Sequence, residues 1–108
     1  MAGKYSFLFT ASAQDDLDET LGYISEDLCN PSAAIGFLNK LEDTLSVICS
    51  FRLSGSLIDN KYVANKKVRK VVIGNYVLYY VPDQAKSEID ILRIIYSQRD
   101  REQIEKEM

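Results

Sequence analysis

The sequence of 108 residues predicts one α+β domain over residues 1–108, and three observations support this fold class. Residues 4–9 alternate with the two-residue period of a β-strand. Two long segments with helical spacing come next, and three strand-like segments come after a loop. This order predicts an N-terminal strand, an antiparallel two-helix hairpin, a three-strand antiparallel meander packed on it, and a short C-terminal helix.

The first helix is predicted over residues 12–28. Ser12 is a plausible N-cap, with Asp15 at the third helical position, where the helix dipole favours an acid. The face opposite the apolar stripe is acidic. Four apolar side chains recur at helical spacing and are expected to face inward: Leu17, Leu21, Ile24 and Leu28.

The second helix is predicted from Asn30-Pro31 to about Cys49, because asparagine caps a helix and proline suits its first position. So short a connection makes the two helices antiparallel neighbours. The residues expected to face inward are Ala34, Leu38, Leu41, Leu45 and Ile48.

The C-terminal half predicts the meander. Residues 50–63 have no period and are expected to form a loop. Gly74-Asn75 is expected to form a two-residue hairpin turn with glycine in the first position. The last strand has almost no polar alternation at its end, as in a central strand covered on both faces. The expected strands are 67–73, 76–81, stopped by Pro82-Asp83, and 87–96, and Asp100 with Gln103 predicts a capped helix over 101–107.

The composition is that of an ordinary globular chain, with 46% hydrophobic and 27% charged residues. The start of the sequence does not resemble a signal peptide, and the 2 cysteines, Cys29 and Cys49, lie within helical patterns. No apolar run approaches the roughly 20 residues that span a bilayer. We therefore expect a cytoplasmic protein with reduced thiols and no membrane partner.

Charge is unevenly distributed along the chain, although the formal net charge is only −3. Residues 1–49 hold 2 basic and 8 acidic residues, whereas residues 50–108 hold 11 basic and 8 acidic ones. Residues 61–70 contain five cations and no acid. This asymmetry could steer an acidic partner to one face, or it could protect an exposed edge strand.

Several classes of chemistry are absent from the sequence. The chain has 0 histidines, which excludes histidine-based catalytic and zinc sites. No phosphate-binding or dinucleotide-binding glycine motif occurs. The acidic pairs Asp15–Asp16 and Glu19–Glu26 are expected to be surface charge. We therefore expect no metal and no small-molecule cofactor.

The order of the motifs resembles that of the RelE/ParE superfamily of toxins from type II toxin-antitoxin systems. Ala11-Ser12-Ala13 leads into the first helix, and Asn30-Pro31 begins the second. The hairpin Val68–Tyr80 then precedes the segment Ile89–Asp100. The resemblance covers nearly the whole chain, and it implies a bacterial toxin that a cognate antitoxin holds inactive.

The superfamily has two mechanistic branches, and departures from the nuclease pattern favour the ParE-like one. RelE-like members cut mRNA on the ribosome, whereas ParE-like members inhibit DNA gyrase. RelE-like nucleases usually carry an arginine after the hairpin tyrosine, where this chain has Val77, and a terminal tyrosine or histidine, which residues 102–108 lack. Docking on ribosomal RNA also requires a basic surface, and this chain is acidic overall.

The resemblance implies two partner surfaces. If the chain were a ribosome-dependent nuclease, the candidate catalytic residues would be Lys70, Tyr96 and Arg99. A third alternative is an inactive member that only binds antitoxin. The candidate target-binding residues are Arg69, Lys70, Arg93, Tyr96, Arg99 and Arg101, and the candidate antitoxin-binding residues are Leu17, Leu21, Tyr23, Ile24 and Phe37.

Overall fold

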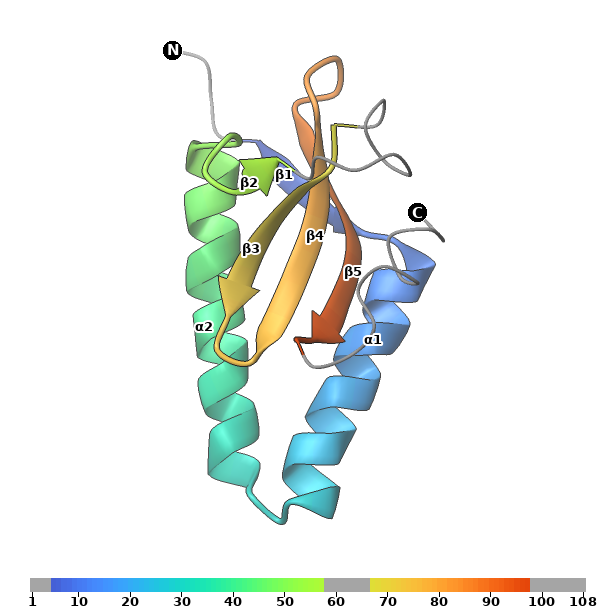
Figure 1. Cartoon of the computed structure of the whole chain (residues 1–108), viewed down its shortest axis with the longest axis vertical. Helices are drawn as coiled ribbons and strands as arrows, with labels where there is room; N and C mark the ends of the chain where they lie inside the picture. The colour runs from blue at the N-terminus through green and yellow to red at the C-terminus, as the bar shows by residue number, and fades with distance from the viewer. Residues whose placement is uncertain (1–4, 58–66, 98–108) are drawn as a thin grey trace.

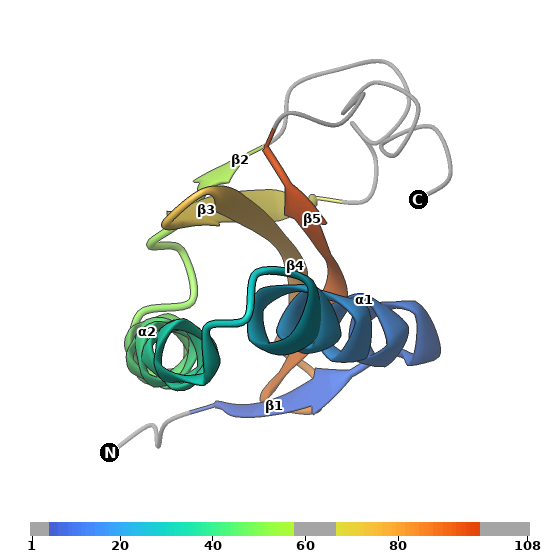
Figure 2. The ribbon, with the colours of Figure 1, turned by 90° about the horizontal axis from the view of Figure 1, so that it is seen from below.

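A computed structural model describes residues 5–57 and 67–97, and it has two layers. A long helical hairpin packs on one face of a five-stranded sheet (Figures 1 and 2). The lower part of the helical hairpin extends past the end of the sheet (Figure 1). The elements are β1 (Ser6–Phe9), α1 (Ala11–Gly22), the π-helical segment η1 (Tyr23–Asp27), α2 (Pro31–Ser50), β2 (Ser56–Leu57), β3 (Arg69–Ile73), β4 (Tyr76–Asp83) and β5 (Glu88–Tyr96).

The strand order is β1-β5-β4-β3-β2, which makes β5 a central strand. The predicted meander β3-β4-β5 is confirmed, with antiparallel pairing throughout. The first strand joins this sheet in parallel beside β5. The short strand β2 lies in the segment for which the sequence predicts a loop, and it pairs with β3 at two positions. The predicted helix over 101–107 lies outside the described residues.

The hairpin between β3 and β4 turns as predicted. Gly74 has φ +58°, while Asn75 does not have a positive φ, as in a turn with glycine in the first position. β4 does not stop before Pro82 but runs to Asp83. Beyond Tyr80, β4 pairs with β5 alone among the described strands. Proline is tolerated there because it has no N–H to donate at an unpaired edge.

The start of the first helix differs from the prediction. Thr10, not Ser12, is the N-cap, and its hydroxyl accepts a hydrogen bond of 3.2 Å from the N–H of Ala13. The same hydroxyl donates to the carbonyls of Ile91 and Leu92 at 3.0 and 3.1 Å. Thr10 therefore caps α1 and fastens it to β5. Sequence alone does not reveal this second role, because the partners lie 81 and 82 positions away.

The first helix also ends differently, and this moves Leu28 out of the apolar stripe. In η1 the N–H of Leu28 donates to the carbonyl of Tyr23, five residues earlier, at 3.0 Å. A π-turn adds a residue to the turn and rotates the residues after it. Leu28 is consequently 55% exposed, whereas Ile24 lies in the core.

The second helix begins as predicted, with the Asn30 side chain accepting a hydrogen bond of 3.1 Å from the N–H of Ala33. Its buried stripe includes Ala34, Leu41, Leu45 and Ile48 but not Leu38, which is exposed. Phe37 takes the expected inward position instead, because its ring packs edge-on against Tyr76 of β4, with ring centres 5.1 Å apart.

Both faces of the sheet carry buried apolar side chains. The main core lies between the helices and the sheet and contains Leu78, Ile91 and Ile94. A second cluster includes Val77, Tyr79 and Ile95, which alternate with those residues along the strands. A register shift in the β4–β5 ladder leaves one extra residue on β5, so that the two-residue alternation is broken there. This confirms that β5 is covered on both faces, although described strands lie on both sides of it only as far as Ile91.

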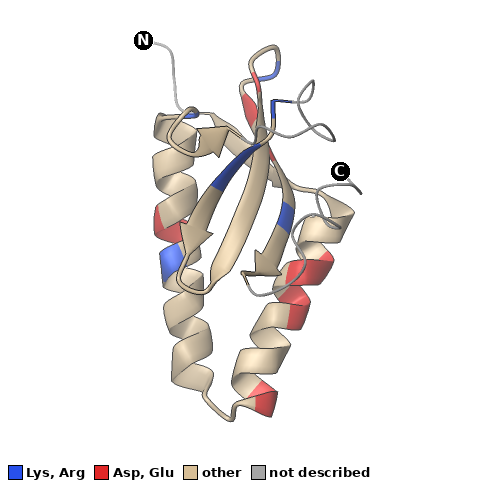
Figure 3. Cartoon of the chain, viewed as in Figure 1, with Lys and Arg blue, Asp and Glu red and all other residues tan. Residues whose placement is uncertain are grey.

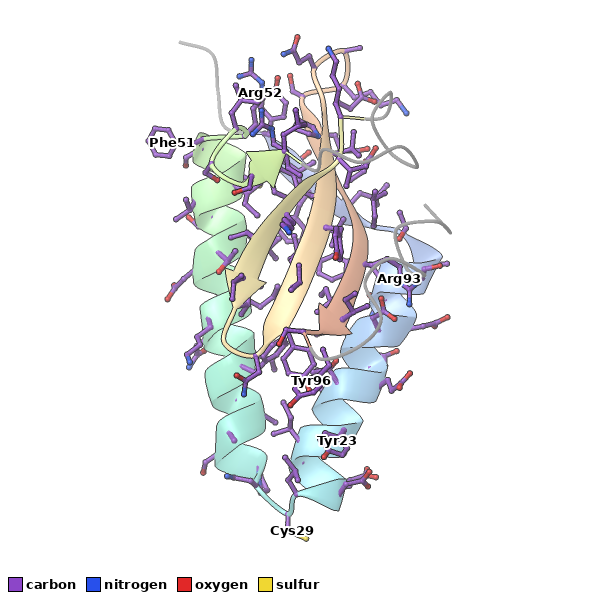
Figure 4. All side chains as sticks on the ribbon, in the orientation of Figure 1. Tyr23, Cys29, Phe51, Arg52, Arg93 and Tyr96 are labelled. Atoms are coloured by element: carbon purple, nitrogen blue, oxygen red, sulfur yellow. The ribbon has the colours of Figure 1, made fainter. Side chains whose placement is uncertain are left out.

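Of the two cysteines, Cys49 is buried in the main core, and Cys29 is exposed at the tip of the helical hairpin (Figure 4). In the part of the chain that the structure describes, neither helix is long and apolar enough to cross a membrane.

Candidate functional site

Arg93, a predicted target-binding residue, is engaged within the fold. Its guanidinium forms two hydrogen bonds with the carboxylate of Asp16 on α1, at 2.7 and 3.1 Å. The same carboxylate accepts the backbone N–H of Ile94 at 3.0 Å. The side chains of Arg93 and Asp16 are 17% and 9% exposed. The pair therefore joins α1 to β5, and this geometry leaves the Arg93 guanidinium little freedom to contact a target.

Asp16 corrects the prediction that the acids of the first helix are all surface charge. Asp16 is only 8% exposed, whereas its neighbour Asp15 is exposed. β1 pairs with β5 only as far as Ile91, so the edge of β5 beyond that residue has no strand beside it in the described part of the chain. Thr10 and Asp16 of the first helical turns satisfy backbone groups at this edge.

Arg69, a second predicted target-binding residue, also has a structural role. Its guanidinium donates to the carbonyls of Leu53 and Gly55 at 3.3 and 2.6 Å. The hydroxyl of Tyr80 accepts the N–H of Gly55 at 2.8 Å and donates to the carbonyl of Arg52 at 2.9 Å. We call this arrangement, the segment 51–55 held by Arg69 and Tyr80, the loop anchor. No pattern in the sequence links that segment to the strands.

Of the remaining predicted cations, Lys70 lies within the described residues, and Arg99 and Arg101 lie outside them. Lys70 is half-buried on β3, opposite Tyr79 of β4 and beside Ser56 of β2. Figure 3 shows the basic residues mainly on the sheet and its upper loops, while acidic residues follow α1 down to the tip of the hairpin; α2 carries both signs, and further acidic residues lie near the upper loop. The charge asymmetry of the sequence thus becomes a spatial one.

A groove of about 750 Å³ lies where the helical hairpin extends past the ends of β4 and β5. Tyr96 and Tyr23 lie between the two helices below the sheet (Figure 4). We call this feature the tyrosine groove. Its lining includes Asp16, Glu19, Tyr23, Glu26, Asp27, Leu28 and Ala33 from the helices, and Asn75, Tyr76 and Tyr96 from the hairpin turn and strands.

Three aromatic rings lead from the core into the tyrosine groove. Phe37 packs edge-on against Tyr76, and Tyr76 packs edge-on against Tyr96, with centres 5.6 Å apart. Burial raises the pKa of the Tyr76 hydroxyl above its ordinary value, Tyr23 and Tyr96 add to the increase, and a hydrogen bond with Thr20 opposes it. At neutral pH the Tyr76 hydroxyl is therefore protonated, so it is not a general base.

The five predicted antitoxin-binding residues are divided between core and surface. Ile24 and Phe37 are buried at 8% and 7% exposure, and Leu17 and Leu21 are half-buried against the main core. Only Tyr23, at 48%, is well exposed. The side chains of Ile24 and Phe37 pack the helical hairpin on the sheet. They would therefore support an antitoxin-binding surface from the core and contribute little exposed area to it.

The described residues contain no group of three or more side chains that could hold a metal ion. Tyr96, the predicted proton-transfer candidate, is 43% exposed and lies in the tyrosine groove, whereas Lys70 lies on the other side of the sheet from Tyr76 by strand alternation. The structure therefore does not bring these two candidate catalytic residues together. The groove itself offers aromatic surface and carboxylates.

Solved structures with the same fold come from toxin-antitoxin systems. The chain is similar to a chain of the chromosomal ParDE toxin-antitoxin system of Pseudomonas aeruginosa, with a TM-score of 0.68, 18% identity, and coverage of 88% of this chain and 98% of that one. It is also similar to a chain of the RelBE2 toxin-antitoxin complex of Mycobacterium tuberculosis, with a TM-score of 0.63, 18% identity, and coverage of 89% of this chain and 94% of that one. The isolated RelE toxin of Escherichia coli gives a TM-score of 0.56 at 14% identity, with coverage of 96% and 99%.

These likenesses show that the chain has the fold of the matched ParDE, RelBE2 and RelE chains. A match of the sequence to a family model assigns the chain to a particular family. The family model for the ParE toxin of the parDE type II toxin-antitoxin system matches residues 7–101, and the chain belongs to this family. No curated protein matches the sequence significantly.

Proposed function

We propose that the protein is the toxin of a type II toxin-antitoxin module that inhibits DNA gyrase and is neutralised by a cognate antitoxin. The main support for a ParE-like activity is the family match over residues 7–101. Arg69 and Arg93, two of the predicted target-binding cations, are engaged within the fold, because Arg69 holds the loop anchor and Arg93 pairs with Asp16. These two side chains are therefore less available to the phosphates of an RNA target.

The antitoxin partner is supported by the solved relatives, which include a ParDE system and a RelBE2 complex. Peptide segments commonly bind as a helix in a groove or as an added strand. The tyrosine groove is a concave surface of a suitable kind. We expect an adjacent reading frame to encode the antitoxin, and a genomic neighbourhood without a small partner frame would contradict this.

The gyrase activity is tested by a supercoiling assay with purified toxin and gyrase. We expect toxin at micromolar concentration to reduce supercoiling, and the purified antitoxin to restore it. Undiminished supercoiling at that concentration would refute gyrase as the target. Expression in cells supplies a second readout, because a gyrase inhibitor should cause filamentation and a DNA-damage response.

The second candidate function is a ribosome-dependent mRNA endoribonuclease, which the half-buried Lys70 and the basic segment 61–70 favour. Primer extension on mRNA from expressing cells would then show cuts in phase with codons. We expect no such cuts. If expression causes no growth arrest of either kind, the chain is an inactive family member that only binds antitoxin.

A further inference from the structure

The tyrosine groove contains aromatic and apolar side chains that the described part of the chain leaves exposed. Tyr23, Leu28 and Tyr96 are 48%, 55% and 43% exposed. Within residues 5–57 and 67–97, the hydroxyls of Tyr23 and Tyr96 make no hydrogen bond to the chain. Contiguous exposed apolar surface in a concave site is typical of a binding surface.

The charge of the tyrosine groove is one-sided. Among the residues that the structure describes, its lining contains four carboxylates and neither lysine nor arginine. Asp16 is neutralised by Arg93. Glu19, Glu26 and Asp27 form no ion pair within the described part of the chain. Three acids beside two exposed tyrosine rings thus favour an occupant with a positive charge.

Among protein side chains, arginine meets both requirements of this groove. Its planar guanidinium stacks on aromatic rings and pairs with carboxylates at the same time. It is also less strongly hydrated than the ammonium of lysine, so it is more easily moved from water to a partly apolar surface. Leu28 and Ala33 in the lining can contact its methylene groups or apolar neighbours.

We propose that the tyrosine groove receives an arginine side chain of the antitoxin. The guanidinium stacks against Tyr23 or Tyr96 and faces the carboxylates of Glu19 and Glu26. This inference rests on the proposed antitoxin partnership, and it adds the chemistry by which the partner is recognised.

The chemistry can be tested with a small probe. N-acetyl-arginine amide is titrated into the full chain and followed by NMR, with N-acetyl-citrulline amide as the neutral probe of the same shape. We expect millimolar binding of the arginine probe, with shifts concentrated at the groove residues. Equal shifts with citrulline, or no shifts at the groove, would overturn the proposal.

Matched charge variants test the carboxylates. The double variant Glu19→Gln/Glu26→Gln should bind the arginine probe about fivefold more weakly than the natural chain, since each partly exposed ion pair contributes modestly. The control is Asp15→Asn/Asp18→Asn, which removes the same charge from exposed positions on α1 outside the groove. An equal loss in both variants would mean that only the overall charge matters, and this would overturn the proposal.

Binding of the purified antitoxin from the adjacent frame separates the role of the groove from the existence of the partnership. We expect it to bind the natural chain and the Asp15/Asp18 control equally, and to bind the Glu19/Glu26 variant at least fivefold more weakly. Equal binding to all three would overturn the role of the groove but leave the toxin-antitoxin assignment intact. No binding to the natural chain would overturn the proposed partnership and this inference with it.

Discussion

In the loop anchor, polar side chains of the sheet hydrogen-bond to the chain itself, whereas in the tyrosine groove comparable groups face solvent. Tyr80 and Arg69 donate to backbone carbonyls between Arg52 and Gly55. At the other end of the sheet, Tyr23 and Tyr96 remain exposed. The same residue type is therefore structural at one end and available at the other. Residue chemistry alone does not separate a site from a scaffold.

The largest loss of stability is expected from breaking the contact that holds α1 against β5 beside the tyrosine groove. Asp16→Ala removes the carboxylate that pairs with Arg93 and accepts the Ile94 N–H. The substitution breaks a largely buried ion pair and also removes the acceptor of a buried backbone N–H, so we expect a loss of about 3 kcal/mol in unfolding free energy. Urea denaturation measures it. Asp15→Ala, an exposed neighbour, should change stability by less than about 0.5 kcal/mol.

The next effect tests the closeness of packing in the loop anchor. A Cβ at Gly55 would lie 2.7 Å from the Lys70 carbonyl oxygen and 2.8 Å from the Tyr80 hydroxyl. Gly55→Ala must displace backbone, and we expect it to cost about 2 kcal/mol in urea unfolding. Gly36→Ala is the matched control, because nothing lies within 4 Å of its Cβ. Inside a helix it should stabilise by up to about 1 kcal/mol.

A smaller loss of stability is expected when one tyrosine hydroxyl is removed, and this change can be made both in the loop anchor and in the tyrosine groove. Tyr80→Phe removes a hydroxyl that makes two hydrogen bonds to the backbone, and we expect a loss of about 1.5 kcal/mol. Tyr96→Phe removes an exposed hydroxyl and should leave thermal stability nearly unchanged. If both variants lost the same stability, the contrast between the ends would be wrong.

The smallest effect concerns alkaline pH. The pKa of Tyr76 is raised in the folded state by burial, so folding favours its neutral form. The stability that this raised pKa contributes is fully present below the unfolded pKa near 10, and it is lost as the pH rises through the pKa of the folded state. The stability of the natural chain should therefore fall above pH 10 more steeply than that of Tyr76→Phe. Urea midpoints at pH 8 and pH 10.5 provide the comparison, and parallel decreases would contradict it.

Local patterns are sufficient to predict most of the fold. Hydrophobic periodicity locates both helices and the meander, and Gly74-Asn75 locates the hairpin turn. The errors lie where a distant contact or an altered turn decides a local feature. Thr10 replaces Ser12 as the N-cap, and its hydroxyl also binds β5. The π-turn in η1 rotates Leu28 outward.

The candidate site is less predictable for a similar reason. Arg69 and Arg93 have the residue type of a phosphate-binding site, but their partners are 14 and 77 positions away in the sequence. Tyr23 and Tyr96 are both candidates from the sequence, which does not show that they line one groove. That proximity arises because the helical hairpin extends past the sheet (Figure 1).

Thr10 and Asp16 hydrogen-bond to backbone groups at the edge of β5, and this limits how a partner can extend the sheet. A strand added beside β5 beyond Ile91 would have to displace Thr10 and Asp16 from Ile91, Leu92 and Ile94. An incoming strand that uses the described part of the sheet therefore meets less resistance at the outer edges of β1 or β2. Addition beside the end of β5 would require α1 to leave, so the partner would have to compete with the folding of the toxin itself.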